Sequence, residues 1–166
     1  MLGYPVAGGV VDGIAWGATY TEELRFGLLP LANAGNVLVA ITVNLTGAHH
    51  DVALAPPQGI EDANSLPFFN VGYAFHEEVT IDDVGFIEAL VTHLQQTYGL
   101  SETDVFATGM SNGGEMSYRL ACEATDVFKA IASVSGTMFR SYADGCAPTR
   151  PVPVFEIHGT LDLLSW

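Results

Sequence analysis

The chain has 166 residues, of which 49% are hydrophobic, and its 19 acidic and 5 basic side chains give a formal net charge of −14. A chain of this length can bury a sizeable core, so we expect one domain over residues 1–166. The negative charge disfavours nucleic acid and anionic membranes as partners, and no apolar tract is long enough to span a membrane.

The first third of the chain predicts two strands and a loop. Residues 36–44 (NVLVAITVN) are a β-branched apolar run typical of a buried strand, and residues 52–55 form a second, shorter run that two prolines end. Residues 58–70 are rich in Gly, Pro, Asn and Asp, which indicates a loop. Residues 1–35 are Gly-rich and weakly periodic, and their pattern assigns them no architecture.

The rest of the chain alternates helical and strand patterns. Thr80 and Asp83 have the spacing of a capping box, after which apolar residues recur at helical spacing until Gly99, so a helix is predicted over residues 82–98. Three strand-like runs and one further helix follow, at residues 104–108 (strand), 115–122 (helix), 128–134 (strand) and 152–158 (strand). This alternation predicts an α/β fold with a mostly parallel sheet and helices on both faces.

Residues 109–114 (GMSNGG) are the most informative part of the chain. Their G-x-S-x-G-G pattern lies between a predicted strand and a predicted helix, which is the arrangement of a nucleophile elbow. Glycines permit the sharp turn, and the helix that follows directs its positive end at a developing oxyanion. The pattern therefore predicts Ser111 as a nucleophile. An ordinary Gly-rich turn, or one that cradles an anion, is the alternative, whereas a P-loop is disfavoured because no Lys follows the glycines.

A serine nucleophile needs a histidine base and a carboxylate that orients it. Asp162 follows the last predicted strand, where such groups lie in open α/β sheets, and is the candidate acid. In the order Ser–Asp–His the histidine should come after Asp162, but residues 163–166 contain none. Of the upstream histidines, His158 is expected to hold its loop by hydrogen bonding, His93 lies on the predicted helix, and His76 lies in a loop.

Neither a metal nor a cofactor is expected. His49, His50 and Asp51 could ligate a metal, but no partner ligand at metal spacing is visible. Cys122 and Cys146 form no C-x-x-C pair, which disfavours a zinc or thioredoxin-type site. The residues alone leave open whether these cysteines form one disulfide or are two buried thiols. The sequence does not determine the oligomeric state.

Several motifs together resemble the polyhydroxybutyrate depolymerase and feruloyl esterase group of α/β-hydrolases. The resemblance covers about residues 52–162, where the order and spacing of the motifs are similar to the family's. The matching segments are 57–59 (PQG), 69–72 (FNVG), 82–87 (DDVGFI), 109–114 (GMSNGG), 118–122 (YRLAC), 146–148 (CAP) and 153–162 (PVFEIHGTLD).

The resemblance implies roles for individual residues. It implies that Ser111 is the nucleophile, that Asp162 is the triad acid, and that the backbone N–H of Asn112 donates to the oxyanion. It also favours a disulfide between Cys122 and Cys146 and a secreted, extracellular protein.

The two ends of the chain depart from the family. Residues 1–50 match it poorly, residues 1–17 lack the features of a signal peptide, and the family's downstream loop with the triad histidine is missing. We therefore expect an incomplete α/β-hydrolase-like domain with weak or no turnover, since losing a triad histidine costs several powers of ten in rate.

Two functions of different classes remain open. The first is a serine carboxylic-ester hydrolase that acts through an acyl-enzyme on polymeric or small esters, either feruloyl or acetyl esters of plant polysaccharide or polyhydroxyalkanoate. The second is a non-catalytic α/β module that binds an aromatic or glycan ligand. A fluorophosphonate probe would label Ser111 only in the first.

Overall fold

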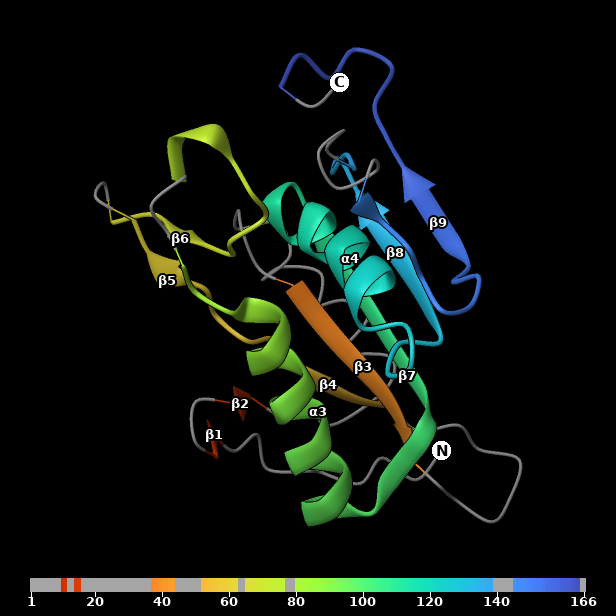
Figure 1. Cartoon of the computed structure of the whole chain (residues 1–166). Helices are drawn as coiled ribbons and strands as arrows, with labels where there is room; N and C mark the ends of the chain where they lie inside the picture. The colour runs from red at the N-terminus through yellow and green to blue at the C-terminus, as the bar shows by residue number, and fades with distance from the viewer. Residues whose placement is uncertain are drawn as a thin grey trace, which may run out of the picture.

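The structure, a computed structural model, describes residues 10–11, 14–15, 37–43, 52–62, 65–76, 80–138 and 145–164 (Figure 1). Its centre is a five-stranded sheet with the strand order β4-β3-β7-β8-β9. These strands are β3 (Val37–Val43), β4 (Val52–Ala55), β7 (Leu100–Met110), β8 (Ala130–Val134) and β9 (Val154–Ile157). Two small hairpins accompany the sheet, β1 (Val10–Val11) with β2 (Ile14–Ala15) and β5 (Ile60–Glu61) with β6 (Pro67–Phe68).

The sheet is parallel on one side and antiparallel on the other. Strands β7, β8 and β9 run parallel, whereas β3 runs antiparallel to both β4 and β7. Only residues 44–51 separate β3 from β4, which is shorter than the dozen or so residues that a parallel crossover needs. The expected α/β class is confirmed, and its parallel sheet is found in β7–β9, while β3 and β4 make the whole sheet mixed.

The loop predicted over residues 58–70 contains the β5–β6 hairpin. Asp62 organises its turn, because its carboxylate accepts the Leu66 N–H at 3.0 Å and its carbonyl accepts the Ser65 N–H at 3.0 Å. A side chain at Gly59 would collide with the backbone of Phe68, so the hairpin depends on this glycine. Strands of two residues are too short to leave a period in the sequence.

Both described helices, α3 (Asp83–Tyr98) and α4 (Asn112–Glu123), pack on the same face of the sheet (Figure 1). Helix α3 begins at Asp82, whose carboxylate accepts the Gly85 N–H at 2.9 Å, so the capping box predicted at Thr80 is wrong. It ends at Gly99, which has a φ of 64°, as predicted. Helices on the second face of the sheet stay a prediction.

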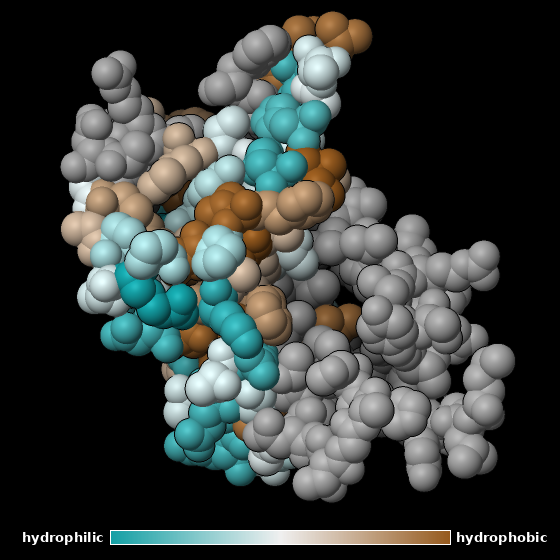
Figure 2. Space-filling view, turned by 90° about the vertical axis from the view of Figure 1, so that its right-hand side faces the viewer, coloured by the Kyte–Doolittle hydropathy of each residue, from teal (hydrophilic) through white to brown (hydrophobic). Residues whose placement is uncertain are grey.

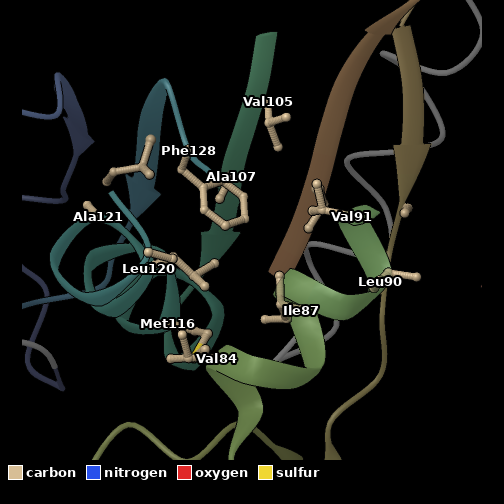
Figure 3. Close-up of a cluster of buried hydrophobic side chains, with 14 of the residues drawn as sticks. Val84, Ile87, Leu90, Val91, Val105, Ala107, Met116, Leu120, Ala121 and Phe128 are labelled. Atoms are coloured by element: carbon tan, nitrogen blue, oxygen red, sulfur yellow. The ribbon is translucent and has the colours of Figure 1, made fainter. Parts of the chain in front are cut away.

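The hydrophobic core lies between the two helices and the sheet (Figure 3). Along β7 the buried side chains of Val105 and Ala107 point toward the helices, while Phe106 and Thr108 on the other face are half-buried. Helices α3 and α4 contribute the facing side chains, namely Val84, Ile87, Leu90 and Val91 from α3 and Met116, Leu120 and Ala121 from α4. This packing fixes the start of α4 against the end of β7.

A disulfide joins Cys122 to Cys146, with their Cα atoms 5.4 Å apart. It ties the last turn of α4 to the segment that leads into β9, and it confirms the pairing that the resemblance implied. Within the described part of the chain, no helix is both long and apolar enough to cross a membrane.

Hydrophobic side chains are exposed at the edge strand β9 and in the loop after it. The side of the molecule on which β9 lies carries several separate hydrophobic areas (Figure 2). The exposed residues in this region are Val154, Phe155, Ile157, Leu161, Leu163 and Leu164.

Candidate active site

Ser111 occupies a strained turn between β7 and α4. Its φ of 54° and ψ of −120° lie in a region that side chains rarely adopt. The turn is held at both ends, because the Ser111 N–H donates to the Val134 carbonyl at 2.8 Å and the Ser111 carbonyl accepts the Glu115 N–H at 3.0 Å. This is the backbone geometry expected of a nucleophile elbow.

Three glycines let the elements around this turn approach closely. A Cβ at Gly109 would lie 2.7 Å from the Gly113 Cα and closer still to its carbonyl group. A Cβ at Gly114 would lie 2.8 Å from the buried Ser133 hydroxyl, and one at Gly136 would lie 2.7 Å from the Glu115 nitrogen. The packing of β7, α4 and the segment after β8 therefore requires Gly109 and Gly114 of the G-x-S-x-G-G pattern, and Gly136 as well.

The candidate acid lies at the same edge of the sheet as Ser111. Hydrogen bonds join the carboxyl ends of β7, β8 and β9 side by side. Ser111, after β7, donates to β8, and the N–H of Ser135, after β8, donates to the Ile157 carbonyl of β9 at 2.8 Å. Neighbouring strands lie about 5 Å apart, so the ends of β7 and β9 are separated by about 10 Å. Asp162 follows β9 in a turn that its own N–H closes on the Gly159 carbonyl at 3.0 Å.

A chain of polar side chains connects α4 to Asp162. The Tyr118 hydroxyl donates to one carboxylate oxygen of Glu156 at 2.9 Å, and the other oxygen of Glu156 lies 2.9 Å from the His158 Nδ1. The His158 Nε2 lies 3.5 Å from the Asp162 carboxylate. Burial raises the pKa of Tyr118 to about 12, and its hydrogen bond to Glu156 adds to the shift. His158 thus has a carboxylate beside each ring nitrogen, which agrees with the prediction that it holds the loop.

The described residues do not place a histidine base beside Ser111. His93 is exposed on α3, and His76 belongs to the short 3₁₀ helix η1 (Ala74–His76), although its side chain lies outside the described part. His49, His50 and Asp51, considered above as metal ligands, also lie outside the described residues. Within that described part, no cluster of three or more His, Cys, Asp or Glu side chains could hold a metal ion.

Sequence reasoning missed a set of contacts between α4 and residues 69–73. The Asn112 side chain accepts the Phe69 N–H at 2.7 Å and donates to the Phe69 carbonyl at 3.0 Å. The Tyr73 hydroxyl donates to the Glu115 carboxylate, and Arg119 donates to the backbone carbonyl of the residue after Phe69. A signal existed in the sequence, because polar residues 112, 115 and 119 are spaced to share one side of a helix.

Burial shifts the pKa values of Tyr73 and Glu115, the hydrogen-bonded pair among these contacts. Burial raises the pKa of Glu115, and the hydrogen bond from Tyr73 opposes that shift. Burial, followed by the hydrogen bond to Glu115, raises the pKa of Tyr73. Asp83 also has a pKa raised by burial, although the Asn70 N–H that its carboxylate accepts at 2.6 Å opposes the shift.

Comparisons with known proteins find similarity over about half of the chain. NocK of Nocardia uniformis, a protein named as an esterase, is 40% identical over 82 residues, which is 49% of this chain and 24% of NocK. A protein of Aspergillus clavatus named as a feruloyl esterase C is 38% identical over 82 residues, 49% of this chain and 29% of that protein. The feruloyl esterase C of Emericella nidulans is 35% identical over 81 residues, with the same two shares. No family model matches the chain.

The predicted resemblance to feruloyl esterases is therefore confirmed for a segment of the chain. The chain spans about a quarter of the length of the curated relatives it matches, at 24% and 29%. Similarity at this level agrees with a partial α/β-hydrolase-like fold, which the sheet and its helices display.

Proposed function

We propose that this chain carries the nucleophile of a serine carboxylic-ester hydrolase and that Ser111 is that nucleophile. The observation that carries the proposal is the strained backbone of Ser111 between β7 and α4, with glycines at each place where a side chain would collide. The esterase names of similar proteins support the same chemistry.

In this proposal the reaction runs through an acyl-enzyme. The Ser111 Oγ attacks the ester carbonyl carbon and gives its proton to a histidine base, which Asp162 orients. The tetrahedral oxyanion accepts a hydrogen bond from the Asn112 backbone N–H, at the positive end of α4. The alkoxide leaves with the proton from the histidine. Water then gives a proton to the histidine and attacks the acyl carbonyl carbon, the bond from that carbon to the Ser111 Oγ breaks, and the Oγ takes the proton back from the histidine as the acid is released.

The proposed substrates follow from the relatives. Feruloyl esters come first because two of the relatives carry that activity in their names. Acetyl esters of plant polysaccharide and polyhydroxyalkanoate are the other proposed substrates. We also propose an extracellular location, which the Cys122–Cys146 disulfide supports, since disulfides persist in oxidising compartments.

Covalent labelling tests the proposal. A fluorophosphonate probe should modify the wild-type chain, and Ser111→Ala should abolish the modification. Ser101→Ala is the matched control, because it removes a hydroxyl at the other end of β7. The alternative function, a non-catalytic module for an aromatic or glycan ligand, requires ligand binding without labelling and is excluded if Ser111 is modified.

A further inference from the structure

One side of helix α4 is occupied by hydrogen bonds to residues 69–73. Asn112, Glu115 and Arg119 are three and four residues apart, so their side chains project from the same side of the helix. Each of them contacts a different residue of the 69–73 segment. The first of the three directly follows the proposed nucleophile, so the segment is attached to the turn that holds it.

The contact made by Asn112 is specific for an amide. Its carbonyl oxygen accepts the N–H of Phe69 while its NH₂ donates to the carbonyl of the same residue, and an ionised carboxylate, which can only accept, cannot do both. Asn112 is only 7% exposed, so loss of either bond would leave a buried polar group unpaired. The residue after Phe69, Asn70, donates its backbone N–H to the carboxylate of Asp83 on α3.

The segment continues into a stacked aromatic pair. The rings of Tyr73 and Phe75 lie 4.8 Å apart with 17° between their planes, and Phe75 is 76% exposed. Tyr73 donates to Glu115, whose N–H donates to the Ser111 carbonyl, so the pair is hydrogen-bonded to a residue of α4 that lies one helical turn from the nucleophile. Figure 1 shows η1 near the first turn of α4, at the end of the molecule to which β8 and β9 point.

We propose that residues 69–75 form a fixed wall of the ester-binding site, and that Asn112 and Glu115 are the positioning residues that hold this wall beside Ser111. The inference rests on the proposed function. Asn112 then has two roles, since its backbone N–H stabilises the oxyanion while its side chain fixes the surface against which the ester lies.

The test measures labelling of Ser111 by two fluorophosphonates, one with a methyl group and one with a bulky aryl group. Asn112→Asp keeps the acceptor for Phe69 but turns a carboxylate oxygen toward the Phe69 carbonyl. We expect the concentration of aryl probe that gives half-maximal labelling to rise about tenfold, with a smaller fall in the limiting rate. The methyl probe, which is too small to reach the wall, should be affected less.

Two further variants make the result decisive. Gln95→Glu is the matched control, because it also turns an amide into a carboxylate and loses a bond to a backbone carbonyl, that of Ser101 at 2.9 Å, far from the turn. It should label like the wild type. Tyr73→Phe keeps the stacked ring but loses the bond to Glu115, and it should shift the aryl probe in the same direction.

The outcomes separate the inference from the proposed function. Equal effects on both probes in a folded Asn112→Asp variant, or an effect equal to that of Gln95→Glu, would overturn the proposal that residues 69–75 form a wall of the site. If Asn112→Asp does not fold, a Tyr73→Phe variant with wild-type labelling by both probes overturns it instead. Failure of the wild type to be labelled at all contradicts the proposed function itself.

Discussion

Replacing Gly109 with alanine adds a methyl group where the structure has no space for one. The new Cβ would lie 2.7 Å from the Gly113 Cα, whereas ordinary van der Waals contact begins at 3.4 Å. The obstructing atoms belong to the backbone of the first turn of α4, so no side-chain rotation can relieve the collision. Strand β7 and helix α4 must move apart, and the turn that carries Ser111 lies between them.

Moving β7 and α4 apart destabilises the folded chain. Overpacking a well-packed interior costs about 1–3 kcal/mol, and a backbone collision belongs at the upper end of that range. In a chain of this size, a loss of about 3 kcal/mol lowers the melting temperature by about 6–12 °C. Thermal unfolding followed by circular dichroism measures it, and fluorophosphonate labelling should be lost in the same variant because Ser111 is displaced.

Gly145→Ala is the control for the Gly109 substitution. A Cβ at Gly145 meets no atom within 4 Å, so this variant should melt within about 1 °C of the wild type. The reasoning about the turn is refuted if Gly109→Ala has the same melting temperature as Gly145→Ala and is labelled at the wild-type rate.

Three further predictions concern the disulfide, the buried acid and the aromatic pair. Reduction of Cys122–Cys146, which are separated by 24 residues, should lower the free energy of unfolding in urea by about 3 kcal/mol, and a loss below about 1 kcal/mol would contradict it. Because burial raises the pKa of Glu115 above its ordinary value of 4.5, the folded state binds this proton more tightly than the unfolded state. The wild type should therefore lose stability relative to Glu115→Gln as pH rises above 4.5, and parallel stability curves would show that burial has no such effect. Phe75→Ala should raise the concentration of aryl fluorophosphonate that gives half-maximal labelling by about 2- to 10-fold, while Phe86→Ala, which removes a 47% exposed ring from α3, should leave it unchanged; equal concentrations in the two variants argue against stacking.

The sequence predicts those elements that local patterns determine. Helix α3 follows from the spacing of its apolar residues, and its end follows from Gly99, which adopts a positive φ. Both signals lie within a short stretch of the sequence. Strand β7 is longer than the apolar run at 104–108, because its pairing with β3 and β8 extends it to Leu100 and Met110. That pairing involves residues far apart in the chain, so the local pattern does not contain it.

The candidate site divides in the same way. The Ser111 turn was predicted because its glycines, strand and helix are adjacent in sequence. The bonds between Asn112 and Phe69 join residues 43 positions apart, and the spacing of polar residues on α4 indicates only that a partner exists. The contacts of His158 are local by comparison, because the two carboxylates beside its ring belong to Glu156 and Asp162, only two and four residues away in the sequence.

Identification of the residue that a fluorophosphonate modifies tests the central claim most directly. Peptide mass spectrometry of the labelled chain should place the modification on Ser111, and the Ser111→Ala variant should carry none. Modification at another residue, or an unmodified wild-type chain under conditions that label a control serine esterase, would contradict the claim that this turn holds a catalytic nucleophile.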